Sequence, residues 1–145
     1  MPFRKPLVLA FLLVLVQCAA VDSQGQQQLK YSVLFPDSQQ VTHFRDEYLS
    51  WRTGGNPKTL TTPFEEAQKI GFLRLLKGYK SDWHPAPLKQ FVMVLSGLME
   101  VEAGDGTRRK FAPGSVLLVT DTQGRGHRTY RVGNQDVLLV WVPVP

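Results

Sequence analysis

The sequence predicts a single all-β domain. From about Lys30 onward, short apolar runs alternate with turn residues at intervals of about eight to twelve residues, which is typical of a sandwich or barrel. The chain has 145 residues, of which 43% are hydrophobic and 20% are charged. This length suits one domain, and this composition excludes a disordered chain, a collagen-like chain and a long coiled coil.

The expected strands are clearest in the second half of the chain. Gly104-Asp105-Gly106 predicts a hairpin tip, and Ser96-Gly97 predicts a tight turn into a return strand. Residues 41–51 fit either a strand or a helix, residues 53–57 predict a loop, and Thr62 is a candidate cap for one helical turn. The expected strands are 31–35, 70–76, 90–95, 98–103, 107–111, 115–119, 127–132 and 137–142.

Strands this short bury their apolar faces only when the sheet closes or two sheets stack. We therefore expect residues 30–145 to form an antiparallel β-barrel or jelly roll. Successive side chains of a strand point to opposite faces, so Gln90, Val92 and Val94 share one face of their strand. On a later strand, His127 and Thr129 share a face in the same way.

The N-terminal segment has the layout of a secretory signal peptide. Basic Arg4 and Lys5 precede the apolar run 7–16, and the small residues Cys18 and Ala20 suit cleavage after Ala20. We therefore expect residues 1–20 to be a signal peptide, residues 21–29 a polar tether, and the protein to be secreted or periplasmic. The apolar run is much shorter than the roughly 20 residues of a membrane span, so no stable span is expected after cleavage. An uncleaved anchor and a lipoprotein attached through Cys18 stay open as alternatives.

Charge and cysteine content narrow the possible functions. The net charge is +5, and loss of residues 1–20 would remove two of those positive charges. So small an excess does not favour a nucleic-acid partner. Cys18 is the only cysteine, so a chain cut after Ala20 would have no disulfide, no catalytic thiol and no cysteine metal cluster.

One segment resembles the first motif of the cupin superfamily, G-x5-H-x-H-x3-4-E-x6-G. Gly78, His84 and Gly97 match their positions in this motif, whereas Ala86 stands at the second His and Gln90 at the Glu. The second cupin motif is matched in part. Pro113-Gly114-Ser115 resembles its opening turn, with Ser for the usual Asp, and His127 fits its late His. The resemblance covers residues 72–141.

This resemblance implies a cupin-type barrel, also called a double-stranded β-helix, with a divalent metal ion inside it. The implied ligands are His84, Gln90 and His127, and the ion is iron, manganese, zinc, nickel or copper. Ala86 cannot bind a metal, and the Gln90 amide is a weaker donor than a carboxylate. Asp121 or Asp82 could supply a carboxylate if the fold brings one of them close. No residue is assigned a catalytic role.

Two function classes stay open. The first is an exported metal-dependent cupin enzyme acting on a small molecule, of dioxygenase, isomerase, lyase or decarboxylase type. The second is a non-catalytic cupin that has lost its metal site and binds a small molecule in the barrel. A homodimer is a further possibility, with the apolar residues 137–142 as its candidate contact.

Overall fold

The computed structural model describes residues 28–55 and 57–145 of the chain. The expected signal peptide 1–20, with Cys18, and most of the expected tether 21–29 lie outside the described residues. Within the described residues there is no α-helix, so the all-β prediction is confirmed. The strands are β1 Leu29–Pro36, β2 Thr42–Leu49, β3 Arg52–Thr53, β4 Leu60–Thr61, β5 Gly71–Leu75, β6 Gln90–Ser96, β7 Leu98–Glu102, β8 Arg108–Phe111, β9 Val116–Val119, β10 Arg128–Val132 and β11 Val137–Pro143.

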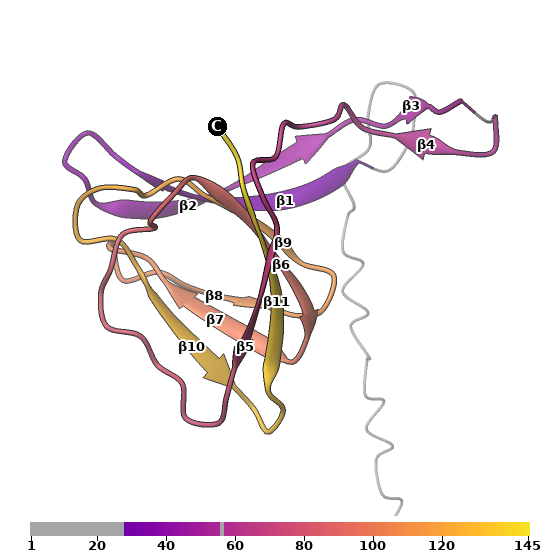
Figure 1. Ribbon diagram of the computed structural model, residues 1–145. Coiled ribbons are helices and arrows are strands. Elements are labelled where there is room, and N and C mark those ends of the chain that lie inside the picture. Colours follow the sequence, from indigo (N-terminus) through magenta and orange to yellow (C-terminus); the bar gives the residue numbers. More distant parts are fainter. Residues whose placement is uncertain (1–27, 56) are drawn as a thin grey trace, which may run out of the picture.

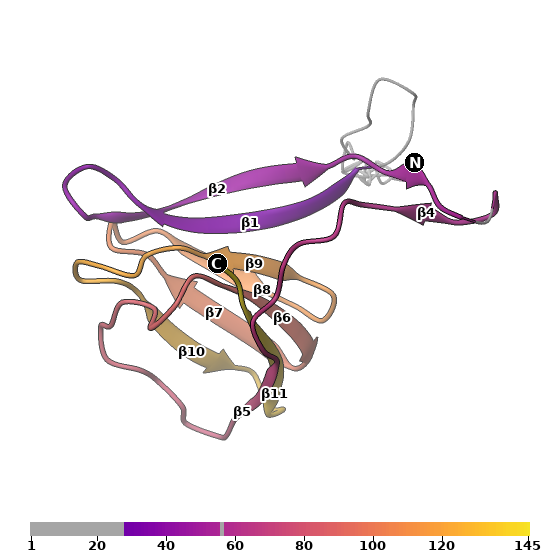
Figure 2. The ribbon, with the colours of Figure 1, turned by 45° about the horizontal axis from the view of Figure 1, so that its top comes forward.

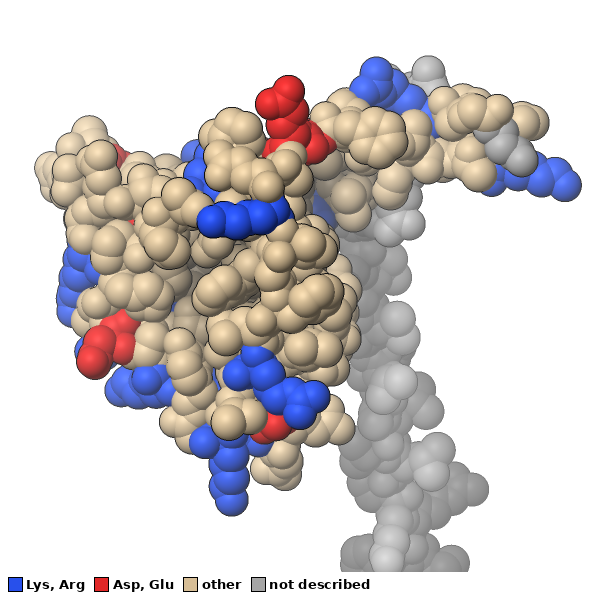
Figure 3. Space-filling view, in the orientation of Figure 1, with Lys and Arg blue, Asp and Glu red and all other residues tan. Residues whose placement is uncertain are grey.

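The strands form two main sheets and a small hairpin arm. The larger sheet has the order β2-β1-β9-β6-β11-β5, and the smaller one has the order β10-β7-β8 (Figure 1). The larger and smaller sheets lie on opposite sides of the core, which the turned view shows most clearly (Figure 2). Strands β3 and β4 form a separate hairpin that projects from the body of the molecule (Figures 1 and 3).

The core lies between the two main sheets and takes apolar side chains from both. On β6 the inward positions Gln90, Val92 and Val94 are buried, as the alternation predicts. Across the core, Met99 and Val101 of β7 are almost fully buried. Complete burial of such a side chain contributes about 1.5–3 kcal/mol. This packing therefore determines which face of each strand points inward.

One expectation about strand pairing was wrong. The Ser96-Gly97 turn does not return β7 beside β6, because β7 pairs with β8 and β10 in the smaller sheet. Gly97 has a φ of 77°, and a Cβ there would lie 2.4 Å from the Asp136 carbonyl oxygen, so the chain crosses between sheets at a position that only glycine fits. The other pairs of described strands are antiparallel, as expected, except that β1 runs parallel to β9. The long connection between these two strands permits that pairing.

Two ambiguous segments near the N-terminal end also have a definite structure. Residues 42–49, which fitted either strand or helix, form β2 and pair with β1 along its whole length. The helical turn expected at Thr62 is absent from the described residues, and that expectation was wrong. Instead, the Gln68 amide donates to the Pro143 carbonyl oxygen at 2.9 Å, which ties this extended segment to the end of β11.

His43 connects two hairpins of the fold. Its Nε2 lies 2.9 Å from Asp37 Oδ2 in the β1–β2 turn, and its Nδ1 lies 2.8 Å from Asp105 Oδ2 in the β7–β8 turn. A carboxylate only accepts hydrogen bonds, so both ring nitrogens donate when His43 is protonated. The hydrogen bonds to Asp37 and then to Asp105 raise the pKa of His43 above its usual 6.5. The same contact with His43 contributes to lowering the pKa of both Asp37 and Asp105.

We predict a pH-dependent contribution of His43 to stability. Because its pKa is raised in the folded state, the stabilisation is complete below about pH 6.5 and is lost as the pH rises through the folded pKa. Since the pKa values of Asp37 and Asp105 are lowered, the carboxylates stay charged down into the acid range. Thermal unfolding of the wild type and His43→Gln should therefore differ more at about pH 5.5 than at about pH 9.5. An equal difference at both pH values would contradict this prediction.

Candidate functional site

The backbone brings His84 and His127 face to face. The His84 amide donates to the His127 carbonyl oxygen at 3.1 Å, and the His127 amide donates back to His84 at 3.0 Å. The same segment continues along β10, where the Ser81 amide donates to Thr129 and the Arg131 amide donates to Tyr79. The loop before β6 therefore extends the smaller sheet and places the two imidazole rings 4.7 Å apart, measured between their centroids.

Gly126 makes this close pairing possible. It has a φ of 76°, and a Cβ at this position would lie only 1.9 Å from the His84 carbonyl oxygen. The left-handed backbone and the lack of space both require glycine here. The Gly126 carbonyl oxygen also accepts a hydrogen bond from the buried Thr42 hydroxyl at 2.9 Å, which ties the loop to β2.

Each imidazole uses the same nitrogen to hold its position. His84 Nδ1 donates to the Asp82 carbonyl oxygen at 2.9 Å, and His127 Nδ1 donates to Asp121 Oδ2 at 2.7 Å. Both partners act as acceptors, so in a neutral ring the proton lies on Nδ1 and Nε2 carries the free lone pair. Within the described residues, neither Nε2 has a hydrogen-bond partner.

The two imidazoles and Gln90 line one interior cavity of about 90 Å³. Gln90 is 7% exposed and enters from the start of β6, so all three predicted donors reach the same space. Within the described part of the chain, the side-chain amide of Gln90 has no hydrogen-bond partner, whereas its backbone belongs to the ladders of β6. Tyr79 and Thr129 are the other polar side chains of the lining, and the remaining walls are apolar or proline, among them Leu75, Val92, Met99, Val101 and Leu139.

The similarity of this chain to known proteins is confined to solved structures. No family model matches the chain, and no curated protein matches it. A solved structure of SPY1581, a conserved protein of unknown function from Streptococcus pyogenes, is 30% identical over 55% of this chain and 68% of that one, with a TM-score of 0.40. The cupin domain of Cnp3 from Schizosaccharomyces pombe is 16% identical over 81% of this chain and 84% of that one, with a TM-score of 0.43.

The structure agrees with the cupin-like fold that the sequence resemblance implies, because two facing sheets enclose the core and the motif residues lie between them. His84 and Gln90 of the first motif and His127 of the second meet in the interior, as the resemblance implied. Ala86, which stands at the second His position, is 3% exposed and lines the same cavity.

Asp121 lies behind His127 in the cupin-like domain and is not among the residues that line the cavity. The sequence left open whether Asp121 donates directly to a metal; in the structure its Oδ2 instead contacts Nδ1 of His127. Asp82 approaches His84 only through its backbone carbonyl, and its own side chain is exposed. Among the described residues, no group of three or more His, Cys, Asp or Glu side chains could hold a metal ion.

Sequence reasoning missed two contributors to the site. Tyr79 lines the cavity because it pairs with β10, and no local pattern indicated that pairing. Trp83, next to His84, contacts two guanidinium groups, with Arg125 3.8 Å and Arg128 4.9 Å from its ring centroid.

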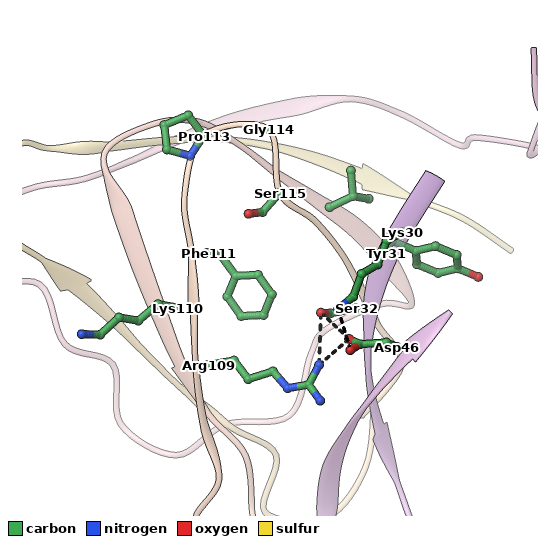
Figure 4. Close-up of a pocket in the computed structure, with 11 residues that line it drawn as sticks. Lys30, Tyr31, Ser32, Asp46, Arg109, Lys110, Phe111, Pro113, Gly114 and Ser115 are labelled. Atoms are coloured by element: carbon green, nitrogen blue, oxygen red, sulfur yellow. Dashed lines mark hydrogen bonds and ion pairs between the residues drawn. The ribbon is translucent and has the colours of Figure 1, made fainter. Parts of the chain in front are cut away.

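A larger hollow of about 660 Å³ lies between β1 and the β8–β9 turn (Figure 4). Its charged groups pair with one another, because Asp46 accepts from Arg109 at 2.5 Å and from Lys30 at 2.9 Å. Ser32 joins the same cluster, and Phe111 lies beside it (Figure 4). The cluster uses its own donors and acceptors, so the interior cavity is the stronger candidate site.

Gly126→Ala should disrupt the pairing of the two histidines. The added Cβ would collide with the His84 backbone, so the loop must move as well as adopt a strained φ. Gly106→Ala is the matched control, because Gly106 has a φ of 85° but open space around its Cβ position. We expect the control to lose about 1–2 kcal/mol of unfolding free energy and Gly126→Ala to lose clearly more, measured by denaturant unfolding. Equal losses would contradict the close approach.

Proposed function

We propose that this cupin-like domain binds one divalent transition-metal ion through His84, His127 and Gln90. The observation that carries the proposal is that the two imidazoles have the same hydrogen-bonding arrangement. Each has its Nδ1 held by an oxygen acceptor, and each has its Nε2 lone pair free at the same cavity. Metal-binding histidines typically donate their other ring nitrogen to a carboxylate or a backbone carbonyl, and both kinds of partner are present here.

The donor set fits some ions better than others. Imidazole nitrogens suit zinc, copper, iron and nickel, whereas magnesium and calcium favour sets of oxygen donors with carboxylates. His84, His127 and the Gln90 amide are all neutral, so a bound ion would keep its charge until an exchangeable ligand completes its shell. This donor set therefore favours zinc, copper, iron or nickel over the hard cations.

The cavity limits what else enters with the ion. A volume of about 90 Å³ is well below the roughly 300–1,000 Å³ of sites for larger ligands. We infer a substrate or ligand of only a few heavy atoms at the innermost position. A bound metal would supply Lewis-acid chemistry, while the chain holds the ion and excludes bulk water with apolar walls. The fold does not select one reaction.

The second candidate function is metal-free binding of a small molecule. It is favoured by Ala86 and Gln90, which stand where the resemblance implies a second His and a Glu. In that case the free Nε2 atoms and the Gln90 side-chain amide would bind polar groups of the ligand.

We further propose that the protein is exported and cleaved after Ala20, which N-terminal sequencing of the secreted chain would test. No helix among the described residues has the length and apolar character of a membrane span.

Elemental mass spectrometry of protein purified without a chelating tag tests metal binding. We expect close to one transition-metal ion per chain, and loss of the ion in His84→Ala and in His127→Ala. His43→Ala is the matched control, because its imidazole lies between Asp37 and Asp105 rather than at the cavity. Absence of bound metal, even after refilling with zinc, copper, iron, nickel and manganese in turn, would refute the metal proposal and favour the metal-free alternative.

Gln90→Glu tests the third donor. A carboxylate at this position would add a negative charge beside the ion, so zinc affinity should rise about tenfold or more, equivalent to about 1.4 kcal/mol. Without metal, the same buried carboxylate would lack a partner, so the metal-free variant should unfold at a lower temperature than the wild type. Competition with a chromogenic chelator and thermal unfolding measure the two effects. Unchanged zinc affinity would exclude Gln90 as a ligand.

A further inference from the structure

We propose that Asp121 is a positioning residue for His127, whose carboxylate holds this imidazole in the tautomer that turns a free Nε2 lone pair toward the cavity. The consequence for metal affinity rests on the proposed function. The effect on the tautomer does not, because it concerns a contact within the metal-free chain. Asp121 therefore acts through His127 and is neither a ligand nor a catalytic residue.

The burial of Asp121 supports this role. Its side chain is fully buried, and Oδ2 lies 2.7 Å from Nδ1 of His127, which is itself only 8% exposed. Its other oxygen, Oδ1, has no hydrogen-bond partner among the described residues. A buried carboxylate without partners is unfavourable, so this side chain is costly for the fold by itself. The hydrogen bond to His127 is the one side-chain interaction that the structure shows for it.

The backbone around Asp121 is well anchored. Its carbonyl oxygen accepts from the Ala86 amide at 3.0 Å, which ties it to the loop that carries His84. Next to it, the Thr120 amide and hydroxyl both donate to the Leu34 carbonyl oxygen, at 2.8 and 3.0 Å. Leu34 is fully buried in the core. The carboxylate is thus held in place by β1 and by the His84 loop, and it can orient His127 without support from solvent.

Charge gives Asp121 a second effect on the same site. The three proposed ligands are neutral, and the cupin Glu position holds Gln90. The Asp121 carboxylate places a negative charge behind His127, on the side away from the cavity. This charge increases the electron-donating power of the His127 ring. Loss of such an outer carboxylate typically weakens metal binding about 10–100-fold.

Asp121→Asn is the test variant, because it keeps the shape of the side chain and removes its charge. We expect zinc affinity to fall about 10–100-fold, measured by chelator competition. We expect the stability of the metal-free variant to be equal or higher, since a buried carboxylate with an unpaired oxygen is removed. Asp82→Asn is the matched control: it removes one charge near His84, but the Asp82 side chain is exposed and its contact with His84 comes from the backbone. Its zinc affinity should be unchanged.

NMR of the imidazole nitrogens reads the tautomer directly and needs no metal. At a pH where both rings are neutral, wild-type His127 should carry its proton on Nδ1, and Asp121→Asn should shift the population toward the Nε2–H form. A wild-type His127 protonated on Nε2 would overturn the proposal, even if the variant fails to fold. An unchanged tautomer and unchanged zinc affinity in Asp121→Asn would also overturn it. If the wild type binds no zinc, the proposed function fails, while the tautomer still decides the role of Asp121.

Discussion

Two backbone hydrogen bonds between His84 and His127 hold the candidate site together, and Gly126 is the residue that permits them. No side chain larger than hydrogen fits at Gly126, because the His84 carbonyl already occupies that space. The pairing joins the loop before β6 to the start of β10. It therefore links His84, which precedes a strand of the larger sheet, with His127, which precedes a strand of the smaller sheet. The two imidazoles are neighbours because the backbones are neighbours.

Contacts outside the cavity support the same loop. The Thr42 hydroxyl, which is fully buried, donates to the carbonyl of Gly126, and the Thr42 carbonyl accepts from the Asp105 amide. The next residue, His43, bridges the β1–β2 and β7–β8 turns through two carboxylates. The N-terminal hairpin therefore stabilises the end of the domain where the His127 loop lies. A change in the protonation of His43 would weaken one link in this chain of contacts without touching the cavity.

The chemistry of the site follows from where its charge lies. The side chains of His84, His127 and Gln90 bring neutral donors to a small, largely apolar cavity. The Asp121 carboxylate contacts the His127 ring on the side away from this cavity. In a cavity of low polarity, electrostatic interactions with a cation are strong, so the Asp121 carboxylate behind His127 would still affect the binding of an ion. In the proposed metal site, neutral donors would leave a bound ion ready to accept an anionic or water ligand. Under that proposal, affinity for the ion would depend on Asp121 as well as on the residues that line the cavity.

Much of this protein could be predicted from the sequence, because the relevant signals are local. The alternation that turns Gln90 and Val92 inward depends only on strand geometry, and the spacing of Gly78, His84 and Gly97 carried the resemblance. The pairing of consecutive strands could not be predicted: Gly97 sends the chain to the other sheet, and that choice depends on packing between residues far apart in sequence. The helical turn at Thr62 is also absent, and the segment that follows it is instead extended, with the Gln68 amide bound to the Pro143 carbonyl oxygen of β11. Only the tertiary structure determines that Asp121 lies behind His127 rather than in the cavity. Its backbone position depends on β9, the His84 loop and the core, and no local pattern determines which side of a ring a buried carboxylate approaches.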